Sequence, residues 1–386
     1  MLVYLECFEK VCDLIGNEKT MRVLHFLTDI KYQSGITSFV MNLYRNIDRE
    51  KVQFDFLVCT ENDISYEEEI KQLGGKIFYC GYPMNYKEIS SACKNIKKFF
   101  ENNKDVYDVI HLHHPTLAVF LNKHVKKCGI KKRIVHSHSS MTSPMLVKSF
   151  INRVLCKWAK KYANIYWACS REAALFLYGN SFCKKHHIEI IKNGVISEKF
   201  RFSDKVREKV RRELEIEDKK VFVHVSNFSV IKNLFFLVPI IKKFEGEEYT
   251  FLFVGDGPTR QEMEERLNAK GIDDRCIFIG LTTDISKYLF ASDALLLPSL
   301  KEGLPVVVVE AQATGMQCLI SDTITRECNV GNVIYLPHEE NAWFQQMKSL
   351  EIDNNDKRLR KSIDFQLSPF EMKNEAKRIE NMYLNL

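Results

Sequence analysis

Short apolar runs alternate with amphipathic stretches along the chain, and this alternation predicts strands that are followed by helices. In the first half, strands are expected at 22–28, 53–59, 76–80, 107–112, 133–137 and 165–169, with helical stretches such as 36–47, 66–73 and 87–101 between them. The pattern restarts after residue 200, with strands expected at 220–226, 249–254, 276–279, 294–297, 317–320 and 333–335. Such alternation is typical of a parallel sheet covered by helices on both faces.

We therefore expect an α/β fold of two successive doubly wound domains, in which ligands bind beyond the carboxyl ends of the strands and in the cleft between the domains. The first domain is expected at 21–198 and the second at 199–367. Residues 1–20 are expected to be an extension outside the fold, because they carry four acids and lack the charge pattern of a secretory signal. A final helix is expected from Ser368, with Ser368 and Glu371 forming a capping box.

Length and composition agree with this picture. The chain has 386 residues, of which 45% are hydrophobic and 27% charged, as in a soluble globular protein of two domains. The sequence contains no apolar run near the roughly 18 residues that a membrane span needs. Its 12 cysteines include no C-x-x-C pair, which favours reduced thiols and a cytoplasmic location over disulfides or a zinc site.

Positive charge is concentrated in the second quarter of the chain. Residues 101–198 contain 16 Lys and Arg against 6 Asp and Glu, a balance that can attract anionic membranes, phosphorylated substrates or nucleic acid. The stretch 147–162 predicts a basic amphipathic helix, which could lie on an anionic membrane or pack its apolar face on the sheet. Nothing in the sequence resembles a nucleic-acid-binding module, so no nucleic-acid partner is expected.

The stretch 292–315 holds the strongest candidate chemistry. A strand ends at Leu297, a loop follows, and Pro305 can start a helix that Gly315 ends. Backbone N–H groups of Gly303 and Leu304 at that helix N-terminus would suit a diphosphate. Two carboxylates flank this anion site, Glu302 in the loop and Glu310 in the helix, and they can accept hydrogen bonds from a sugar and a ribose. The spacing alone is equally compatible with a charged loop before an ordinary amphipathic helix.

Two further strand ends are candidates for phosphate binding. Lys232 follows the strand 220–226, where a lysine can neutralise a leaving diphosphate, although most lysines are simply solvated. Gly35, in the segment 33–35, follows the first strand, where a glycine lets the backbone approach a ligand closely. The turn 254–258 is not the G-x-G-x-x-G of a dinucleotide fold.

Histidines occur in two groups, at 111–114 and 136–138. His111 and His113 are expected to share one strand face, as are His136 and His138. No cysteine or acidic residue has metal-ligand spacing to them, so we expect no metal. His138 is the better candidate for contacting a substrate hydroxyl or for proton transfer, with a packed histidine as the alternative.

Together these residues resemble a known family. The run from Glu302-Gly303-Leu304-Pro305 to Glu310 resembles the E-x7-E motif of the retaining GT-B glycosyltransferases of family four, or group one. Further matches are Pro298-Ser299, residues 311–315, Asn193-Gly194-Val195 and Val254–Pro258. The segments 167–179 and 321–327 resemble the branch that builds capsular polysaccharide and exopolysaccharide. The resemblance extends from about Met21 to the C-terminus.

The resemblance implies two Rossmann-like domains that face each other across a cleft, with the last helix, 368–386, packing back on the first domain. It implies retention at the anomeric carbon, a nucleotide sugar as co-substrate, and neither metal nor separate cofactor. It also implies roles for individual residues: Glu302 at the donor sugar, the Gly303–Pro305 backbone near sugar or phosphate, Glu310 at the ribose, Lys232 at the diphosphate, Gly35 at the phosphate from the facing domain, and His138 as the active-site histidine.

One departure concerns the phosphate site. The family pattern is G-R-x4-K before the helix, whereas Ser226 and Asn227 stand at the glycine and arginine here. One positive charge on the leaving group is missing, which is compatible with slower chemistry, a substitute cation or loss of activity.

The hypothesis is a transferase that moves a hexose from a UDP-sugar to a surface-polysaccharide or lipid-linked acceptor at the inner face of the membrane. The alternatives are a non-catalytic nucleotide-sugar-binding protein and a nucleotide-sugar epimerase of the same fold.

Overall fold

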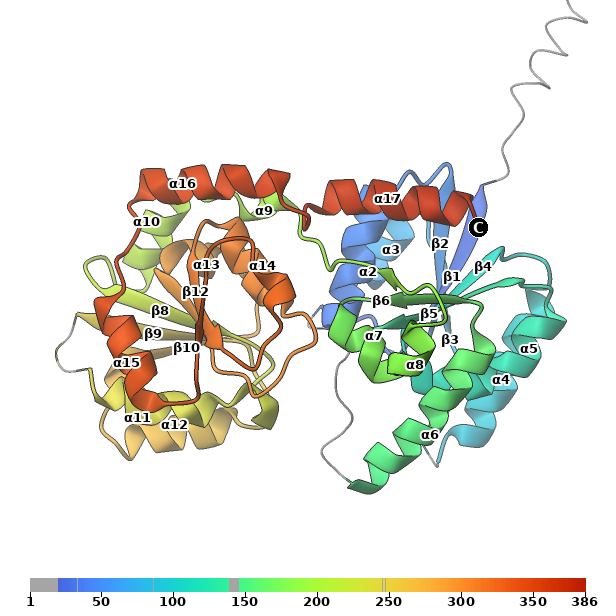
Figure 1. Cartoon of the computed structure of the whole chain (residues 1–386), viewed down its shortest axis with the longest axis horizontal. Coiled ribbons are helices and arrows are strands. Elements are labelled where there is room, and N and C mark those ends of the chain that lie inside the picture. The colour runs from blue at the N-terminus through green and yellow to red at the C-terminus, as the bar shows by residue number, and fades with distance from the viewer. Residues whose placement is uncertain (1–19, 33, 86, 139–145, 245, 247) are drawn as a thin grey trace, which may run out of the picture.

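The structure is a computed structural model that describes residues 20–32, 34–85, 87–138, 146–244, 246 and 248–386, without the side chains of 146–153. The expected extension 1–20 therefore lies, apart from Thr20, outside the described residues, as does Gln33. The described chain forms two parallel sheets with helices packed around each (Figure 1). The expected α/β fold with two Rossmann-like units is confirmed.

The first sheet has seven parallel strands in the order β3-β2-β1-β4-β5-β6-β7. Its strands are β1 Met21–Leu27, β2 Val52–Val58, β3 Ile77–Tyr79, β4 Val109–Leu112, β5 Lys132–Ser137, β6 Ile165–Ala168 and β7 Glu189–Ile190. Its helices are α2 Gly35–Asn46, α3 Glu67–Gln72, α4 Ile89–Asn102, α5 Ala118–Lys127, α6 Leu146–Tyr162, α7 Arg171–Tyr178 and α8 Asn180–Cys183. The inner strands are buried on both faces, which explains their nearly continuous apolar runs.

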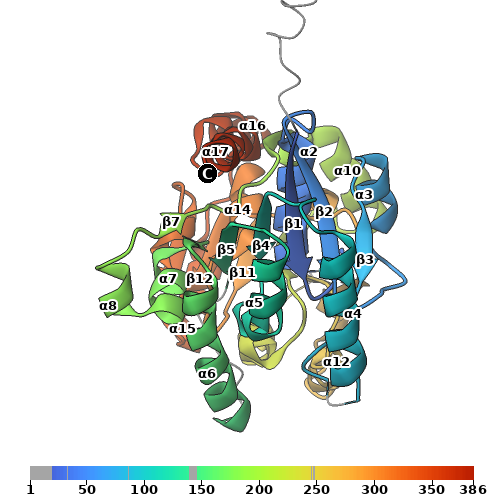
Figure 2. The same cartoon turned by 90° about the vertical axis from the view of Figure 1, so that its right-hand side faces the viewer.

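Helices cover the first sheet on both faces. Residues of α4, α5, α6 and α7 pack against one face, and residues of α2 pack against the other (Figure 2). Helix α6 lies where a basic amphipathic helix was expected. Its Ala159 and Tyr162 are buried in the core, whereas Val154 and Trp158 are 41% and 44% exposed. None of the helices in the described part of the chain combines the length and apolarity needed to span a membrane.

The second sheet has six parallel strands in the order β10-β9-β8-β11-β12-β13. Its strands are β8 Lys220–Val225, β9 Tyr249–Val254, β10 Cys276–Gly280, β11 Ala294–Leu297, β12 Gln317–Ser321 and β13 Val333–Leu336. Its helices are α9 Ser197–Phe200, α10 Asp204–Glu213, α11 Leu237–Lys242, α12 Arg260–Asn268, α13 Ser286–Ala291, α14 Val306–Ala313, α15 Glu340–Ser349 and α16 Asn355–Asp364. In both sheets the order of strands reverses at one point, between β1 and β4 and between β8 and β11, where ligands of such folds bind.

The chain passes between the two sheets twice, and the two passages touch. Val195 and Glu371 form a parallel bridge, in which the N–H of Val195 donates to the carbonyl of Phe370 at 2.9 Å. A Cβ on Gly194 would lie 3.1 Å from the backbone of Phe370 and Met372. The close approach of these two passages is a physical reason for the glycine of Asn193-Gly194-Val195.

The last helix, α17 Met372–Leu384, packs against α2 beside the first sheet (Figure 1). It begins four residues later than expected, because the bridge to Val195 keeps Glu371 extended (ψ 116°). Glu371 is the N-cap and accepts from the Lys373 N–H, so the capping box with Ser368 is wrong. Tyr383 is fully buried near the end of α17, and its hydroxyl lies 2.6 Å from Nδ1 of His111.

A second contact joins the two units. The N–H of Arg171, at the start of α7, donates to the Glu327 carboxylate at 3.1 Å. Burial raises the pKa of Glu327, and the Glu172 carboxylate adds to this rise. These residues come from the two segments, 167–179 and 321–327, that resemble the polysaccharide branch.

Truncation of Tyr383 should show how far the first unit depends on α17. We expect Tyr383→Ala to lower the free energy of unfolding by about 3–5 kcal/mol through the cavity it leaves. Tyr383→Phe should cost about 1–3 kcal/mol, because it leaves His111 Nδ1 without its partner. Urea denaturation followed by circular dichroism would measure both; a Tyr383→Ala protein as stable as the unchanged chain would show that α17 does not pack this way.

Candidate functional site

The candidate site in the second unit is built from two loops at the point where the strand order reverses. The loop after β8 covers 226–233, and the loop after β11 covers 298–305. The Leu300 N–H donates to the Ile231 carbonyl at 2.9 Å, and the Asn233 side-chain amide donates to the Pro298 carbonyl at 3.3 Å. These bonds fix the two loops to each other and place their charged side chains together.

Lys232 and Glu302 form an ion pair across these loops. The Lys232 Nζ donates to Glu302 Oε1 at 2.6 Å, and the side chains are only 18% and 14% exposed. A charge-assisted bond of this kind is strong, and partial burial reduces its screening by water. An arriving anion can take the ammonium group as its partner, which frees carboxylate oxygens for hydroxyl donors. The structure thus brings together two residues that the sequence nominated separately.

A glycine turn supports the loop after β8. Gly255 has φ +123°, and a Cβ there would lie 1.9 Å from the Ser226 carbonyl oxygen. A Cβ on Gly257 would lie 2.7 Å from the Phe228 carbonyl oxygen, which also accepts from the Thr259 hydroxyl at 2.8 Å. Only glycine lets the turn 254–258 approach the loop this closely.

Helix α14 starts directly behind Glu302. It begins at Val306, one residue later than expected, because Pro305 is extended (ψ 101°) and serves as the N-cap without a side-chain cap bond. Gly303 and Leu304 form the turn before it. The first backbone N–H groups of a helix have no carbonyl partner within it, so they can serve a bound anion. At the other end, Gly315 follows the helix with φ +73°.

Glu310 lies on α14 and is partly buried. Burial raises the pKa of its carboxyl to about 7, and the nearby Lys199 opposes this rise only in part. No described residue donates a hydrogen bond to it. Partial burial disfavours the charged form of a carboxyl that has no donor, and two hydroxyls of a ligand would supply donors. Such an environment is compatible with the prediction that Glu310 binds the hydroxyls of a ribose.

The position of the missing arginine is also visible. Asn227 is exposed, and its side-chain oxygen accepts from the Ser229 hydroxyl at 3.2 Å. His224, which was not predicted as a site residue, lies next to this loop. Its Nε2 lies 2.7 Å from Ser226 Oγ and its Nδ1 lies 2.9 Å from the Leu296 carbonyl. A histidine inside a buried strand gave no signal that it would hold the loop that follows.

In the first unit, Gly35 is the first residue of the twelve-residue helix α2. The Ser34 side chain caps the helix by accepting from the Thr37 N–H at 3.4 Å. A Cβ on Gly35 would meet nothing within 4 Å, so packing does not require a glycine there. The open space beside a helix N-terminus is compatible with the expected phosphate contact.

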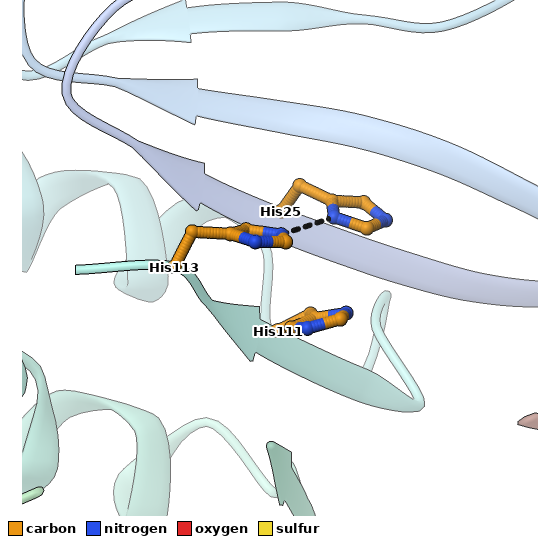
Figure 3. A group of neighbouring side chains, drawn as sticks. All are labelled: His25, His111 and His113. Carbon is orange, nitrogen blue, oxygen red and sulfur yellow. Dashed lines mark hydrogen bonds between the residues drawn. The ribbon is translucent and has the colours of Figure 1, made fainter. Parts of the chain in front are cut away.

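His138 lies at the end of β5 and is bonded to another histidine. Its Nε2 is 2.8 Å from Nδ1 of His113, and burial lowers the pKa of His138 to about 3. A neutral ring of such low basicity favours hydrogen bonding to substrate over acceptance of a proton. His113 in turn lies 2.9 Å from His25 of β1, a residue that the sequence analysis missed (Figure 3).

Two groups of three histidines are close enough in space to consider a metal ion. These are His25, His111 and His113, and His113, His136 and His138, with ring nitrogens within 4.8 Å of one another. The expected sharing of a face by His111 with His113 and by His136 with His138 agrees with the close approach of their rings, whose centroids are 4.1 and 3.9 Å apart.

Each of the two units matches a known protein family. Residues 33–199 match the model described as Glycosyltransferase Family 4, and residues 206–355 match Glycosyl transferases group 1. The chain is 32% identical over 323 residues to "Putative glycosyltransferase EpsF" of Bacillus subtilis, which covers 82% of this chain and 83% of the relative.

Two other similarities are informative. An Escherichia coli "UDP-Gal:alpha-D-GlcNAc-diphosphoundecaprenol alpha-1,3-galactosyltransferase" is 25% identical over 59% of this chain and 61% of its own. The crystal structure of Anabaena Alr3699/HepE in complex with UDP-glucose superposes with a TM-score of 0.76 at 16% identity, over 95% of this chain and all of that chain. The latter establishes similarity of fold.

The raised pKa of Glu310 predicts a specific pH dependence of stability. In the folded chain Glu310 keeps its proton up to about pH 7, whereas in the unfolded chain it loses it near the ordinary value of 4.5. The folded state therefore binds more protons between these values, and its stability falls as pH rises through this window. Glu310→Gln should remove that fall, and above pH 7 the variant should be more stable by up to about 3 kcal/mol.

Urea denaturation at pH 5 and pH 8 would measure this difference, with the exposed Glu351→Gln as the control. A Glu310→Gln protein whose stability relative to the unchanged chain is the same at both pH values would contradict the burial of this carboxyl.

Proposed function

The chain belongs to the group 1, or family 4, glycosyltransferases, and from this premise we propose that it is a retaining transferase of a hexose-type sugar. The donor is a nucleotide sugar with UDP, and the acceptor is a growing surface polysaccharide or a lipid-linked glycan. Three similarities support this choice: the name EpsF, the diphosphoundecaprenol acceptor of the Escherichia coli relative, and the UDP-glucose bound by HepE.

The ion pair of Lys232 and Glu302 in front of α14 is the observation that carries the proposal. In one stretch of surface, Glu310 offers a carboxyl for the ribose, the start of α14 and Lys232 offer positive charge for the diphosphate, and Glu302 offers oxygens for sugar hydroxyls. These groups match the successive parts of a nucleotide sugar.

The reaction follows from this arrangement. As the bond between the anomeric carbon and the diphosphate oxygen breaks, negative charge grows on the diphosphate, where Lys232 and the N–H groups of α14 stabilise it. The acceptor hydroxyl attacks from the same face, and its proton passes to the departing phosphate oxygen. No protein nucleophile is required. Because the lysine and the helix supply the positive charge, we propose that the transfer needs no metal.

The acceptor side is proposed to lie in the first unit. Gly35 and His138 flank the point where the first sheet reverses its strand order. The exposed Trp158 and Val154 on the lysine-bearing α6 suit contact with an anionic membrane surface, where a lipid-linked acceptor would be found.

A non-catalytic nucleotide-sugar-binding protein is the second candidate, and the exposed Asn227 at the arginine position favours it. A screen of nucleotide sugars against native membrane extract would decide. Labelled sugar in a lipid or glycan product supports transfer, UDP binding without any product supports the second candidate, and conversion of the donor alone would indicate an epimerase.

Removal of either partner of the ion pair should slow the reaction. We expect Lys232→Ala and Glu302→Ala each to lower kcat/KM at least about tenfold, or roughly 1.4 kcal/mol of transition-state stabilisation. The exposed Lys242→Ala on α11 serves as the matched control and should keep full activity. Normal turnover in one of the two site variants would remove the role proposed for that residue.

Restoring the missing cation gives the opposite prediction. Asn227→Arg should increase turnover about tenfold if a second positive charge on the diphosphate limits the rate. Initial rates at saturating donor would measure it, with Asn227→Gln as the control for side-chain length. An arginine variant no faster than the glutamine variant would show that another group already supplies this charge.

A further inference from the structure

Five histidines form a cluster at the carboxyl edge of the first sheet, and the transfer mechanism uses only one of them. They are His25 of β1, His111 and His113 at the end of β4, and His136 and His138 at the end of β5. His25, His111, His113 and His136 are at most 1% exposed. Imidazoles buried at such density need a hydrogen-bonding pattern that satisfies them.

The hydrogen bonds divide this histidine cluster into two chains. One chain runs from His25 Nδ1 to His113 Nε2 at 2.9 Å and from His113 Nδ1 to His138 Nε2 at 2.8 Å. The other runs from the Tyr383 hydroxyl to His111 at 2.6 Å and from His111 Nε2 to His136 Nδ1 at 3.2 Å. Only the first chain reaches His138.

Burial keeps the rings of the first chain neutral. It lowers the pKa of His25 and His138 to about 3, and that of His113 well below its ordinary value. A neutral imidazole carries one N–H, so each ring can donate only one of its two bonds. The three protons must therefore all point in one direction along the chain. Either His25 donates to His113 and His113 to His138, or both bonds run the other way.

The ends of the chain decide between the two directions. His25 Nε2 and His138 Nδ1 are both buried and have no hydrogen-bond partner among the described residues, so either direction leaves one buried N–H without an acceptor in the protein itself. In the reverse direction His25 Nε2 would carry an N–H without an acceptor, with its ring 4.2 Å from the ring of Phe54. Buried N–H groups without an acceptor are rare in proteins. With His25 as first donor, the free N–H falls instead on His138 Nδ1. His138 is partly exposed whereas His25 is fully buried, so a ligand can supply the missing acceptor only at the His138 end.

We propose that His25 and His113 are positioning residues that fix the ring orientation and tautomer of His138, so that its Nδ1–H donates to a substrate oxygen. This inference rests on the proposed function for its substrate, a sugar or phosphate oxygen. This role explains why imidazoles are buried here, although packing of the core does not require them. His111 and His136 flank this chain by ring contacts and do not determine the tautomer.

The distances distinguish this chain from a metal site. Two imidazole nitrogens on a tetrahedral zinc ion, each about 2.0–2.1 Å from the metal, lie about 3.3 Å apart. The two bonds of the chain are 2.9 and 2.8 Å, the length of a hydrogen bond with a proton between the nitrogens. Bound zinc would replace both protons, so the two readings exclude each other.

Substitution of His113 by two residues of nearly equal shape tests the proposal. Asparagine can still donate to His138 Nε2 from the position of Nδ1, whereas leucine cannot. We expect His113→Leu to lower kcat at least about tenfold, and His113→Asn to stay within about threefold of the unchanged protein. The KM for the donor and the affinity for UDP should change less than kcat, because Lys232 and Glu302 in the other unit still hold the donor.

His111→Leu is the matched control, since His111 lies on the same strand, is equally buried and makes no bond to His138. It should shift the melting temperature by about as much as His113→Leu does but leave kcat within about threefold. Equal kcat losses in the two leucine variants would show that the cluster only holds the fold, and full activity of His113→Leu would also overturn the proposal.

The tautomer itself is open to measurement. Nitrogen-15 NMR of histidine-labelled protein, assigned with His138→Gln, should show His138 protonated on Nδ1 in the unchanged chain and in His113→Asn, but not fixed in His113→Leu. Protonation on Nε2, or near-stoichiometric zinc in the purified protein by mass spectrometry, would overturn the inference. This measurement needs no turnover, so a protein that transfers no sugar would defeat the proposed function and still leave the tautomer decidable.

Discussion

All strands of each sheet run in one direction, and this constraint brings the functional side chains of each unit together. The loops after β8 and β11 meet because both strands end at the same edge, on either side of the point where the strand order reverses. Lys232 and Glu302 are 70 residues apart in sequence and become partners for this reason. The same constraint in the first sheet places His25, His113 and His138 in one hydrogen-bonded chain.

Glycines allow close backbone contacts around these loops at positions where a side chain would not fit. Gly255 and Gly257 let one turn lie against the carbonyls of Ser226 and Phe228, and Gly194 lets the two passages between the units touch. Because backbone contacts fix this loop, the ammonium group of Lys232 is not needed to hold the loop in place. The ion pair with Glu302 then gives each charge a partner until a ligand with a better one arrives.

Much of the second unit was predictable from sequence, because its signals are local. A strand, a loop with Glu302 and a helix with Glu310 succeed one another within some twenty residues, and the helix start was misplaced by only one. The cap of α17 was wrong because a distant residue, Val195, holds the chain extended there. His25 and His224 escaped notice for a similar reason: each looks like one polar residue within a buried strand, and its partner comes from another part of the fold.

Glu310 and the histidine cluster have one property in common, which is that neither is needed for packing of the fold. A partly buried carboxyl without a donor and a buried chain of imidazoles both lower the stability of the unloaded protein. Apolar residues of similar size would pack in either place without that cost. Binding of a ligand is the simplest explanation for polar groups that make the core less stable. Glu310 in one unit and the histidine cluster in the other therefore mark the two ends of the proposed site for the sugar nucleotide. The ion pair supplies the charge for its departure, and the neutral rings supply hydrogen bonds for its orientation.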